Sequence, residues 1–236
     1  ARPDYLKWVE PPAQAPSWLG NIRVVGRMFM PDEESNKMIW QGAVGADMWF
    51  DRWLPVFQQR PWIWAWEGPN EPQPMANSDF RAKLDAFTAR LANHMGTVNL
   101  KLVGHNWAVG WPDKGHATDF ETSMFLLVKW GHLLGLHEYS APAMWDGGNW
   151  LTLRYRKTIA ELESAGIVIP QIFIGECGID GGVLAQPKTG WQTFTQGNAR
   201  AYMEQLAWYD AEIARDKLVT AATVFTVCSW DWHDFN

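Results

Sequence analysis

The sequence predicts an α/β protein whose parallel strands close into a barrel. Short apolar runs alternate with helical patterns along all 236 residues, as expected for strands joined by helices. Consecutive runs are not joined by hairpin turn signals, which indicates right-handed, parallel β-α-β units. No glycine-rich phosphate loop follows an early strand, because the nearest candidate, residues 178–182 (GIDGG), comes late and lacks the full spacing. An eightfold barrel therefore fits better than an open, doubly wound sheet.

The predicted strands are short runs of apolar and β-forming residues. They cover residues 5–9, 22–30, 62–66, 100–107, 133–139, 171–176 and 219–227. Helices are predicted where apolar residues recur at helical spacing, namely over residues 46–57, 80–95, 151–162 and 202–213, and more weakly over 121–130. We expect Ser78 to cap the second of these helices and Gly96 to end it. No linker or repeat interrupts the chain, so residues 1–236 are predicted to form one catalytic domain.

Composition excludes several classes of protein. The net charge of −6 and the scattered lysines and arginines argue against a nucleic-acid partner. No stretch approaches the roughly 18 apolar residues of a membrane span. The six histidines show no ligand spacing, so neither a catalytic metal nor another cofactor is expected. Cys177 and Cys228 are expected to be two free thiols rather than a disulfide. The chain begins with Ala1, as a mature secreted or a trimmed protein would, and we expect the secreted form.

Tryptophan is unusually abundant, with 17 residues. A flat apolar ring with an N–H donor can stack on a sugar and still donate a hydrogen bond. Trp62, Trp64 and Trp66 share one predicted strand and are expected to pack against helices. We expect two or three of the tryptophans at or beyond strand ends to line sugar subsites; these are Trp107, Trp111, Trp145, Trp150 and Trp191.

Two glutamates stand at the ends of predicted strands. Residues 66–72 read W-E-G-P-N-E-P and present Glu71, and residues 172–176 read I-F-I-G-E and end in Glu176. The carboxyl ends of barrel strands meet at one face, where active sites form. Hydrolysis of a glycosidic bond needs one protonated carboxyl to protonate the leaving oxygen and one ionised carboxylate to attack or to activate water. The pair is therefore predicted to be catalytic.

The ordered set of motifs resembles the large clan of retaining glycoside hydrolases with (β/α)8 TIM barrels, which includes cellulases, mannanases, xylanases and β-galactosidases. The resemblance implies that Glu71 is the acid/base and Glu176 the nucleophile. It also implies that Asn70 binds the sugar 2-hydroxyl, that Tyr139 in H-E-Y-S faces the nucleophile, and that Trp230 is the platform beneath the sugar. The implied activity is retaining hydrolysis of β-glycosidic bonds in a poly- or oligosaccharide. The alternatives are a non-catalytic carbohydrate-binding barrel and a cell-wall-degrading glycosidase on the same fold.

The strand count departs from the clan. If Glu71 ends strand four, residues 22–30 and 5–9 are strands three and two, and strand one with its helix would precede Ala1. The last helix would also be missing after strand eight. An open seam exposes backbone edges and apolar faces, so we expect a compensating partner or self-association.

Charged residues on the early strands leave alternatives open. Glu67 is expected to be a buried structural carboxylate paired with a cation, rather than a third catalytic acid. Arg27 can orient the nucleophile and hold it ionised at the substrate site, or form a salt bridge with Glu67. Lys7 is equally consistent with a site cation and a partner in the barrel core.

Polar residues on the later strands are interpreted individually. His105 and Asn106 end a strand where packing does not explain a polar pair, so substrate contact is predicted for both. His137 is expected to be an inward barrel residue with a satisfied hydrogen bond rather than a ligand. Glu138 should alternate away from His137 and is left as structural.

Overall fold

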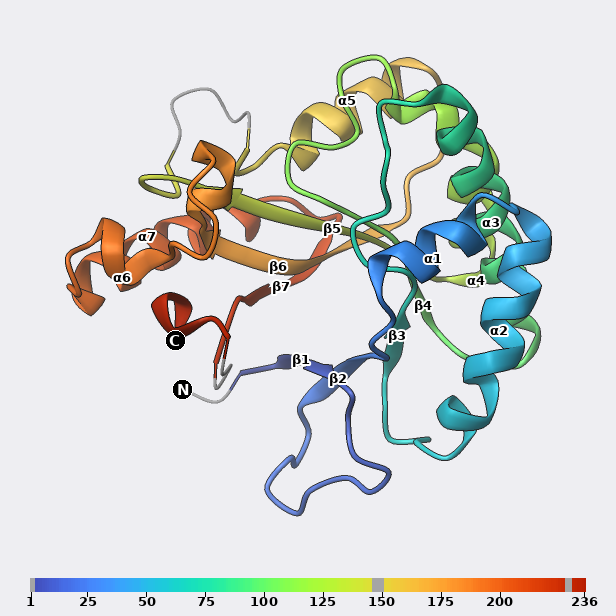
Figure 1. Ribbon diagram of the computed structural model, residues 1–236, viewed down its shortest axis with the longest axis horizontal. Helices are drawn as coiled ribbons and strands as arrows, with labels where there is room; N and C mark the ends of the chain where they lie inside the picture. The colour runs from blue at the N-terminus through green and yellow to red at the C-terminus, as the bar shows by residue number, and fades with distance from the viewer. Residues whose placement is uncertain (1–2, 146–150, 228–230) are drawn as a thin grey trace.

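The computed structural model of the protein describes residues 3–145, 151–227 and 231–236. It contains a seven-stranded, all-parallel sheet with strands in sequential order, curved into a nearly closed barrel and flanked by helices (Figure 1). The strands are β1 Tyr5–Val9, β2 Arg23–Arg27, β3 Ala65–Glu67, β4 Leu102–Trp107, β5 Leu133–Ser140, β6 Gln171–Ile179 and β7 Val219–Val224. The helices are α1 Asp32–Ile39, α2 Ala43–Gln58, α3 Ser78–Thr97, α4 Glu121–Trp130, α5 Tyr155–Ser164, α6 Trp191–Phe194 and α7 Ala199–Ile213, with 3-10 turns η1 Ala117–Phe120, η2 Gly181–Leu184 and η3 His233–Phe235.

The inside of the barrel is filled at one level by an apolar side chain from each strand. Because strand residues alternate between the two faces of a sheet, one inward position per strand forms such a layer. Its members are Tyr5, Val25, Ala65, Val103, Leu133, Phe173 and Ala221, with Trp64 packed beside them. This layer is a packed core, and it closes the barrel below the site described next.

A second, larger core lies between the sheet and the helices. Trp66 of β3 points outward there and stacks on Phe57 of α2, with ring centroids 4.3 Å apart. Helices α2, α3 and α4 pack side by side over β3 and β4 (Figure 1). The expectation that the tryptophans of this segment pack against helices is therefore confirmed for Trp66. It was wrong for Trp64, which packs on the apolar layer inside the barrel and meets Tyr5 edge-on at 5.3 Å.

The barrel has a seam between β1 and β7. In the sheet order of the described residues these two strands are the edges, and each pairs on one side only. Their side chains are half-buried, whereas β4 and β5 are buried throughout. A cavity of about 380 Å³ opens between them and is bounded by Lys7, Glu176 and Phe225 among others. Self-association through this seam stays a prediction.

Most elements agree with the sequence-based expectation, and the differences are local. Strand β3 begins at Ala65, so Trp62 and Trp64 precede it. Helix α3 is capped by Asn77, whose side chain accepts from the Phe80 N–H, so the expected Ser78 cap was wrong by one residue. Cys177 is a buried free thiol. Within the described ranges, no helix combines the length and apolar character needed to cross a bilayer. Trp150, Cys228 and Trp230 lie outside the described residues.

Candidate active site

A polar layer lies directly above the apolar layer, two residues further along β1, β2 and β3. Lys7 follows Tyr5 on β1, Arg27 follows Val25 on β2, and Glu67 follows Ala65 on β3. The corresponding positions on β5 and β6 are glycines. A Cβ at Gly175 would lie only 2.6 Å from Glu67 Oε1 and 3.3 Å from His137 Nε2. Glycine on β6 therefore leaves the room that the carboxylate of Glu67 occupies.

Glu176 is the centre of the polar layer. Lys7 Nζ lies 2.9 Å from its Oε1, and Arg27 Nη1 lies 3.3 Å from the same oxygen. Tyr139 Oη donates to Oε2 at 2.7 Å, and His137 Nδ1 lies 3.6 Å from Oε2. Burial alone would raise the pKa of Glu176, but its electrostatic interactions with His137, Lys7 and Arg27 outweigh burial and hold that pKa well below its usual range. Glu176 is therefore an ionised carboxylate near neutral pH.

Glu67 and Lys7 form a buried ion pair behind Glu176. The distance from Lys7 Nζ to Glu67 Oε2 is 3.0 Å, and the two side chains are 8% and 0% exposed. This confirms that Glu67 is a structural carboxylate, and its cation is Lys7. Arg27 instead donates to Asn70 Oδ1 and contacts Glu176. Lys7 thus serves both of its predicted roles, since it joins the barrel interior to the site.

Glu71 approaches Glu176 from the segment that follows β3. Its backbone N–H donates to the Asn106 carbonyl at 3.1 Å, and its φ of 40° lies in the left-handed region that few non-glycine residues adopt. Its Oε1 is 2.8 Å from His137 Nδ1, and its side chain is 37% exposed. One oxygen of Glu71, one of Glu176 and one ring nitrogen of His137 all lie within 4.8 Å of one another. The two glutamates predicted to be catalytic are therefore brought together, with His137 between them.

Among the residues that the structure describes, these three groups are the set that could hold a metal ion. Two carboxylates and an imidazole are ligands for several divalent cations. However, Oε1 of Glu176 already faces the ammonium of Lys7 and the guanidinium of Arg27. Those two positive charges would repel a cation placed beside them. The local charge therefore disfavours a metal at this position.

The structure corrects the prediction for His105 and Trp107. A register shift interrupts the pairing of β4 between Gly104 and Trp107, and the φ of His105 is +70°. His105 therefore points outward, where its Nε2 is 2.9 Å from Ser123 Oγ at the start of α4. Trp107 stacks on His105 at 4.7 Å and is 0% exposed. Neither side chain reaches a surface where a substrate could bind.

Asn106 also lacks the exposure that substrate contact requires, at 0%. Its side chain points into the barrel, since a Cβ on Gly135 would overlap its Oδ1. Its Nδ2 donates to the carbonyls of Pro69 and Val103, at 3.3 Å each. Together with its backbone bond to Glu71, these contacts hold the loop that carries Glu71. The prediction that Asn106 contacts substrate was therefore wrong, and Asn106 instead supports the loop that carries Glu71.

Aromatic side chains around the pair only partly match the prediction. Trp145 is 50% exposed but meets Trp208 of α7 edge-on at 6.1 Å, so its sugar contact stays a prediction. Trp230 falls in a stretch that is not described. Phe225, which directly follows β7, meets Tyr139 edge-on at 6.1 Å. Phe225 was not predicted as a site residue, because it falls within the predicted strand 219–227, whereas β7 ends at Val224.

Glu138 lies on the opposite face of β5 from His137 and Tyr139, as alternation predicts. Its Oε2 accepts from Leu153 N and Tyr209 Oη at 2.8 and 2.7 Å, and its Oε1 accepts from Tyr155 N at 3.0 Å. Glu138 thereby ties β5 to the start of α5 and to α7. Burial raises the pKa of Glu138 to about 7, although these hydrogen bonds and Arg156 lower it in part. The expected structural role is confirmed.

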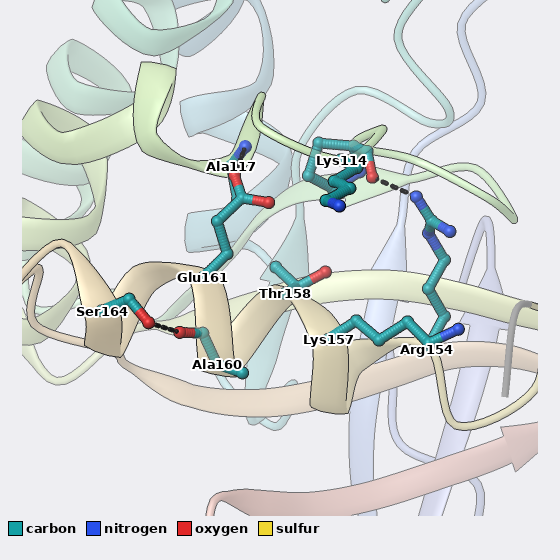
Figure 2. Close-up of a pocket in the computed structure, with 9 residues that line it drawn as sticks. Lys114, Ala117, Arg154, Lys157, Thr158, Ala160, Glu161 and Ser164 are labelled. Atoms are coloured by element: carbon teal, nitrogen blue, oxygen red, sulfur yellow. Dashed lines mark hydrogen bonds between the residues drawn. The ribbon is translucent and has the colours of Figure 1, made fainter.

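A separate pocket of about 600 Å³ lies between the segment after β4 and helix α5 (Figure 2). Glu161 of α5 ties the two sides of this pocket together, because its carboxylate accepts hydrogen bonds from the N–H groups of Gly115 and Ala117 at 2.8 and 2.7 Å. Arg154 donates to the carbonyl of Pro112. None of the residues predicted to be catalytic lines this pocket. The hydrogen bonds of Glu161 and Arg154 connect the segment after β4 to α5, which is a structural role.

His137 is the site residue that the sequence analysis undervalued. The expected inward hydrogen bond exists, but its partner is Glu71. The available signal was the spacing in H-E-Y, which places His137 on the same strand face as Tyr139. A comparison of the sequence with models of known protein families finds no match, and a search among curated proteins finds none either.

Proposed function

We propose that the protein hydrolyses β-glycosidic bonds in a poly- or oligosaccharide with retention of configuration. The observation that carries the proposal is the separation of the carboxylates, since an oxygen of Glu71 lies within 4.8 Å of an oxygen of Glu176. Retaining enzymes hold the two groups about 5–5.5 Å apart, whereas inverting enzymes leave about 6.5–9.5 Å for a water. We further propose that the sheet is a (β/α)8 TIM barrel of the clan that the motifs resemble, without its first strand and helix and its last helix.

In this mechanism Glu176 is the nucleophile. Its ionised carboxylate attacks the anomeric carbon while Glu71 gives its proton to the departing glycosidic oxygen, and a covalent glycosyl ester forms. Glu71 then takes a proton from water, which attacks the anomeric carbon and releases Glu176. The hydroxyl of Tyr139 and the cations Lys7 and Arg27 fix Glu176 in the orientation needed for attack.

Arg27 also orients Asn70. Its guanidinium donates to Asn70 Oδ1, which leaves the amide NH₂ of Asn70 to donate to the sugar 2-hydroxyl. Hydrogen bonds to this hydroxyl strengthen in the transition state and supply several kcal/mol. Arg27 therefore acts on both the nucleophile and the sugar-binding amide, and its own contact with substrate stays a prediction.

Two alternatives remain as proposals of lower rank. A carbohydrate-binding barrel without catalysis would bind sugar with both glutamates intact and release no product. A cell-wall-degrading glycosidase would use the same two glutamates on a different glycan, because fold and substrate are loosely coupled.

The experiment begins with wild-type protein and a panel of β-linked polysaccharides and aryl β-glycosides, assayed for new reducing ends or released phenol. In Glu176→Gln we expect turnover to fall by at least a thousandfold while sugar binding persists. In Glu71→Ala, azide should restore turnover and yield a β-glycosyl azide, because the small anion needs no general base. Wild-type rates in Glu176→Gln would refute the proposal. A wild type that binds glycans without cleaving any would favour the binding barrel.

A further inference from the structure

The end of the barrel that carries Glu71 and Glu176 holds more acids than the reaction needs. Asp32 begins α1, shortly after Arg27 ends β2. It borders a small depression together with Arg27 and Asn70. Asp180 follows β6, four residues after Glu176. The two acids therefore extend from the strands that carry Arg27 and Glu176, at the end of the barrel where Glu71 lies.

Asp180 is held in place on the barrel rim. The backbone N–H of Asp180 donates to the Ser140 carbonyl at 3.1 Å, next to Tyr139. Its side chain accepts from the Gly182 N–H at 2.7 Å. Burial raises the pKa of Asp32 and of Asp180, and the charge of Glu71 raises both further, while Arg27 lowers the pKa of Asp32 in part and the Gly182 N–H lowers that of Asp180 in part. The negative charges of the rim and of the catalytic pair are thus close enough to interact.

The cations of the site are already engaged. Lys7 and Arg27 both face Oε1 of Glu176, and their side chains are only 8% and 16% exposed. Lys188, on the same loop as Asp180, has its ammonium over the ring of Trp232. The stretches 146–150 and 228–230 contain no lysine or arginine. Arg27 borders the same depression as Asp32, but its guanidinium already contacts Asn70 and Glu176. Within the described part of the chain, a carboxylate on a substrate would therefore meet Asp32 and Asp180, while the cations of the site are engaged with other groups.

We propose that this rim makes the cleft selective for glycans whose sugars at the cleaved bond are uncharged or carry an amino group, and that it rejects uronic acids. The inference rests on the proposed function and names its substrate class. Like charges placed together without compensation oppose binding, and selectivity against a competitor is often achieved through such repulsion. An ammonium on the sugar would instead be attracted by the same carboxylates.

The test compares matched 4-nitrophenyl glycosides that differ in one group: the neutral β-glycoside, the corresponding β-glycuronide and the 2-amino-2-deoxy-β-glycoside. Both gluco and galacto series are used. We expect kcat/KM for the glycuronide to be at least a hundredfold below that of the neutral sugar. In the double variant Asp32→Asn, Asp180→Asn the gap, meaning the ratio of kcat/KM for the neutral glycoside to that for the glycuronide, should fall at least tenfold. Addition of 0.5 M salt should also reduce this ratio. The substitution Asp180→Asn keeps a side-chain oxygen that can accept from the Gly182 N–H, so the loop should hold.

Glu163→Gln, which removes an exposed acid on α5, is the charge-matched control and should leave the gap unchanged. A glycuronide hydrolysed within threefold of the neutral sugar would overturn the inference, as would an unchanged gap in the double variant. Binding of the same sugars to Glu176→Gln, followed by tryptophan fluorescence, separates the two proposals. If no glycoside is cleaved but binding still discriminates against uronides, the proposed function fails and the selectivity stands.

Discussion

Glu138 is a fully buried carboxylate that the proposed reaction does not use, and it makes protein stability depend on pH. In the folded protein its pKa is about 7, against an ordinary value of 4.5. Because the folded-state pKa is the higher one, the stabilisation is complete below pH 4.5 and is lost as the pH rises through 7. At 1.36 kcal/mol per pKa unit the total is about 3 kcal/mol. About 2.5 kcal/mol of this falls between pH 5 and pH 8.

The variant Glu138→Gln cannot ionise and tests this directly. We expect urea unfolding, followed by tryptophan fluorescence, to show that wild type loses about 2.5 kcal/mol more stability than the variant between pH 5 and pH 8. Glu163→Gln on α5 controls for the removal of an exposed acid and should follow wild type. An equal loss in wild type and Glu138→Gln would refute the reasoning, whatever the absolute stabilities are.

Three further predictions concern the polar layer and the seam. Lys7→Met leaves Glu67 and Glu176 without their shared cation, so we expect a loss of about 3–5 kcal/mol of stability in urea unfolding. Loss of that cation also raises the pKa of the nucleophile, so the acid limb of the kcat/KM profile should move to higher pH; an unmoved limb would contradict the role of Lys7. Gly175→Ala places a Cβ 2.6 Å from Glu67 Oε1 and should reduce both stability and kcat. Gly104→Ala is the control, because its Cβ would crowd Leu127 and Thr88 outside the barrel, and it should reduce stability but not kcat. If Gly104→Ala and Gly175→Ala lose kcat equally, Gly175 has no specific effect at the site. For the seam, sedimentation velocity should show dimers whose fraction rises with protein concentration, and a monomer at every concentration would show that the β1 and β7 edges do not associate.

The strands and helices and their order along the chain could be predicted from the sequence, because the spacing of apolar residues distinguishes strands from helices. Each predicted strand lies on or beside an observed one. The two glutamates were expected at strand ends, but β3 ends at Glu67, four residues before Glu71, and β6 continues past Glu176 to Ile179. The glycines on β5 and β6 were not interpreted in advance, since only the packed barrel shows that Gly175 leaves room for Glu67. A sequence indicates which residues face the inside of the barrel. It gives less information on which side chains from different strands contact one another inside it.

The end of β4 was predicted wrongly for a specific physical reason. The polar pair at the end of the predicted strand suggested that His105 and Asn106 reach the substrate. The register shift and two residues with positive φ reverse the alternation of side chains along the strand, so His105 is buried against α4 and Asn106 supports the Glu71 loop. A residue other than glycine in the left-handed region gives no reliable sequence signal. The same limit applies to Glu71 itself, whose positive φ turns its carboxylate toward His137.

The most direct test of the central claim is covalent trapping of the nucleophile. The protein would be incubated with 2-deoxy-2-fluoro-β-glycosyl fluorides, and its intact mass and peptides would then be measured. We expect an added mass of one fluoroglycosyl group on the peptide that contains Glu176, and no label in Glu176→Gln. A label on another residue, or cleavage of a glycoside with inversion of configuration, would contradict the claim.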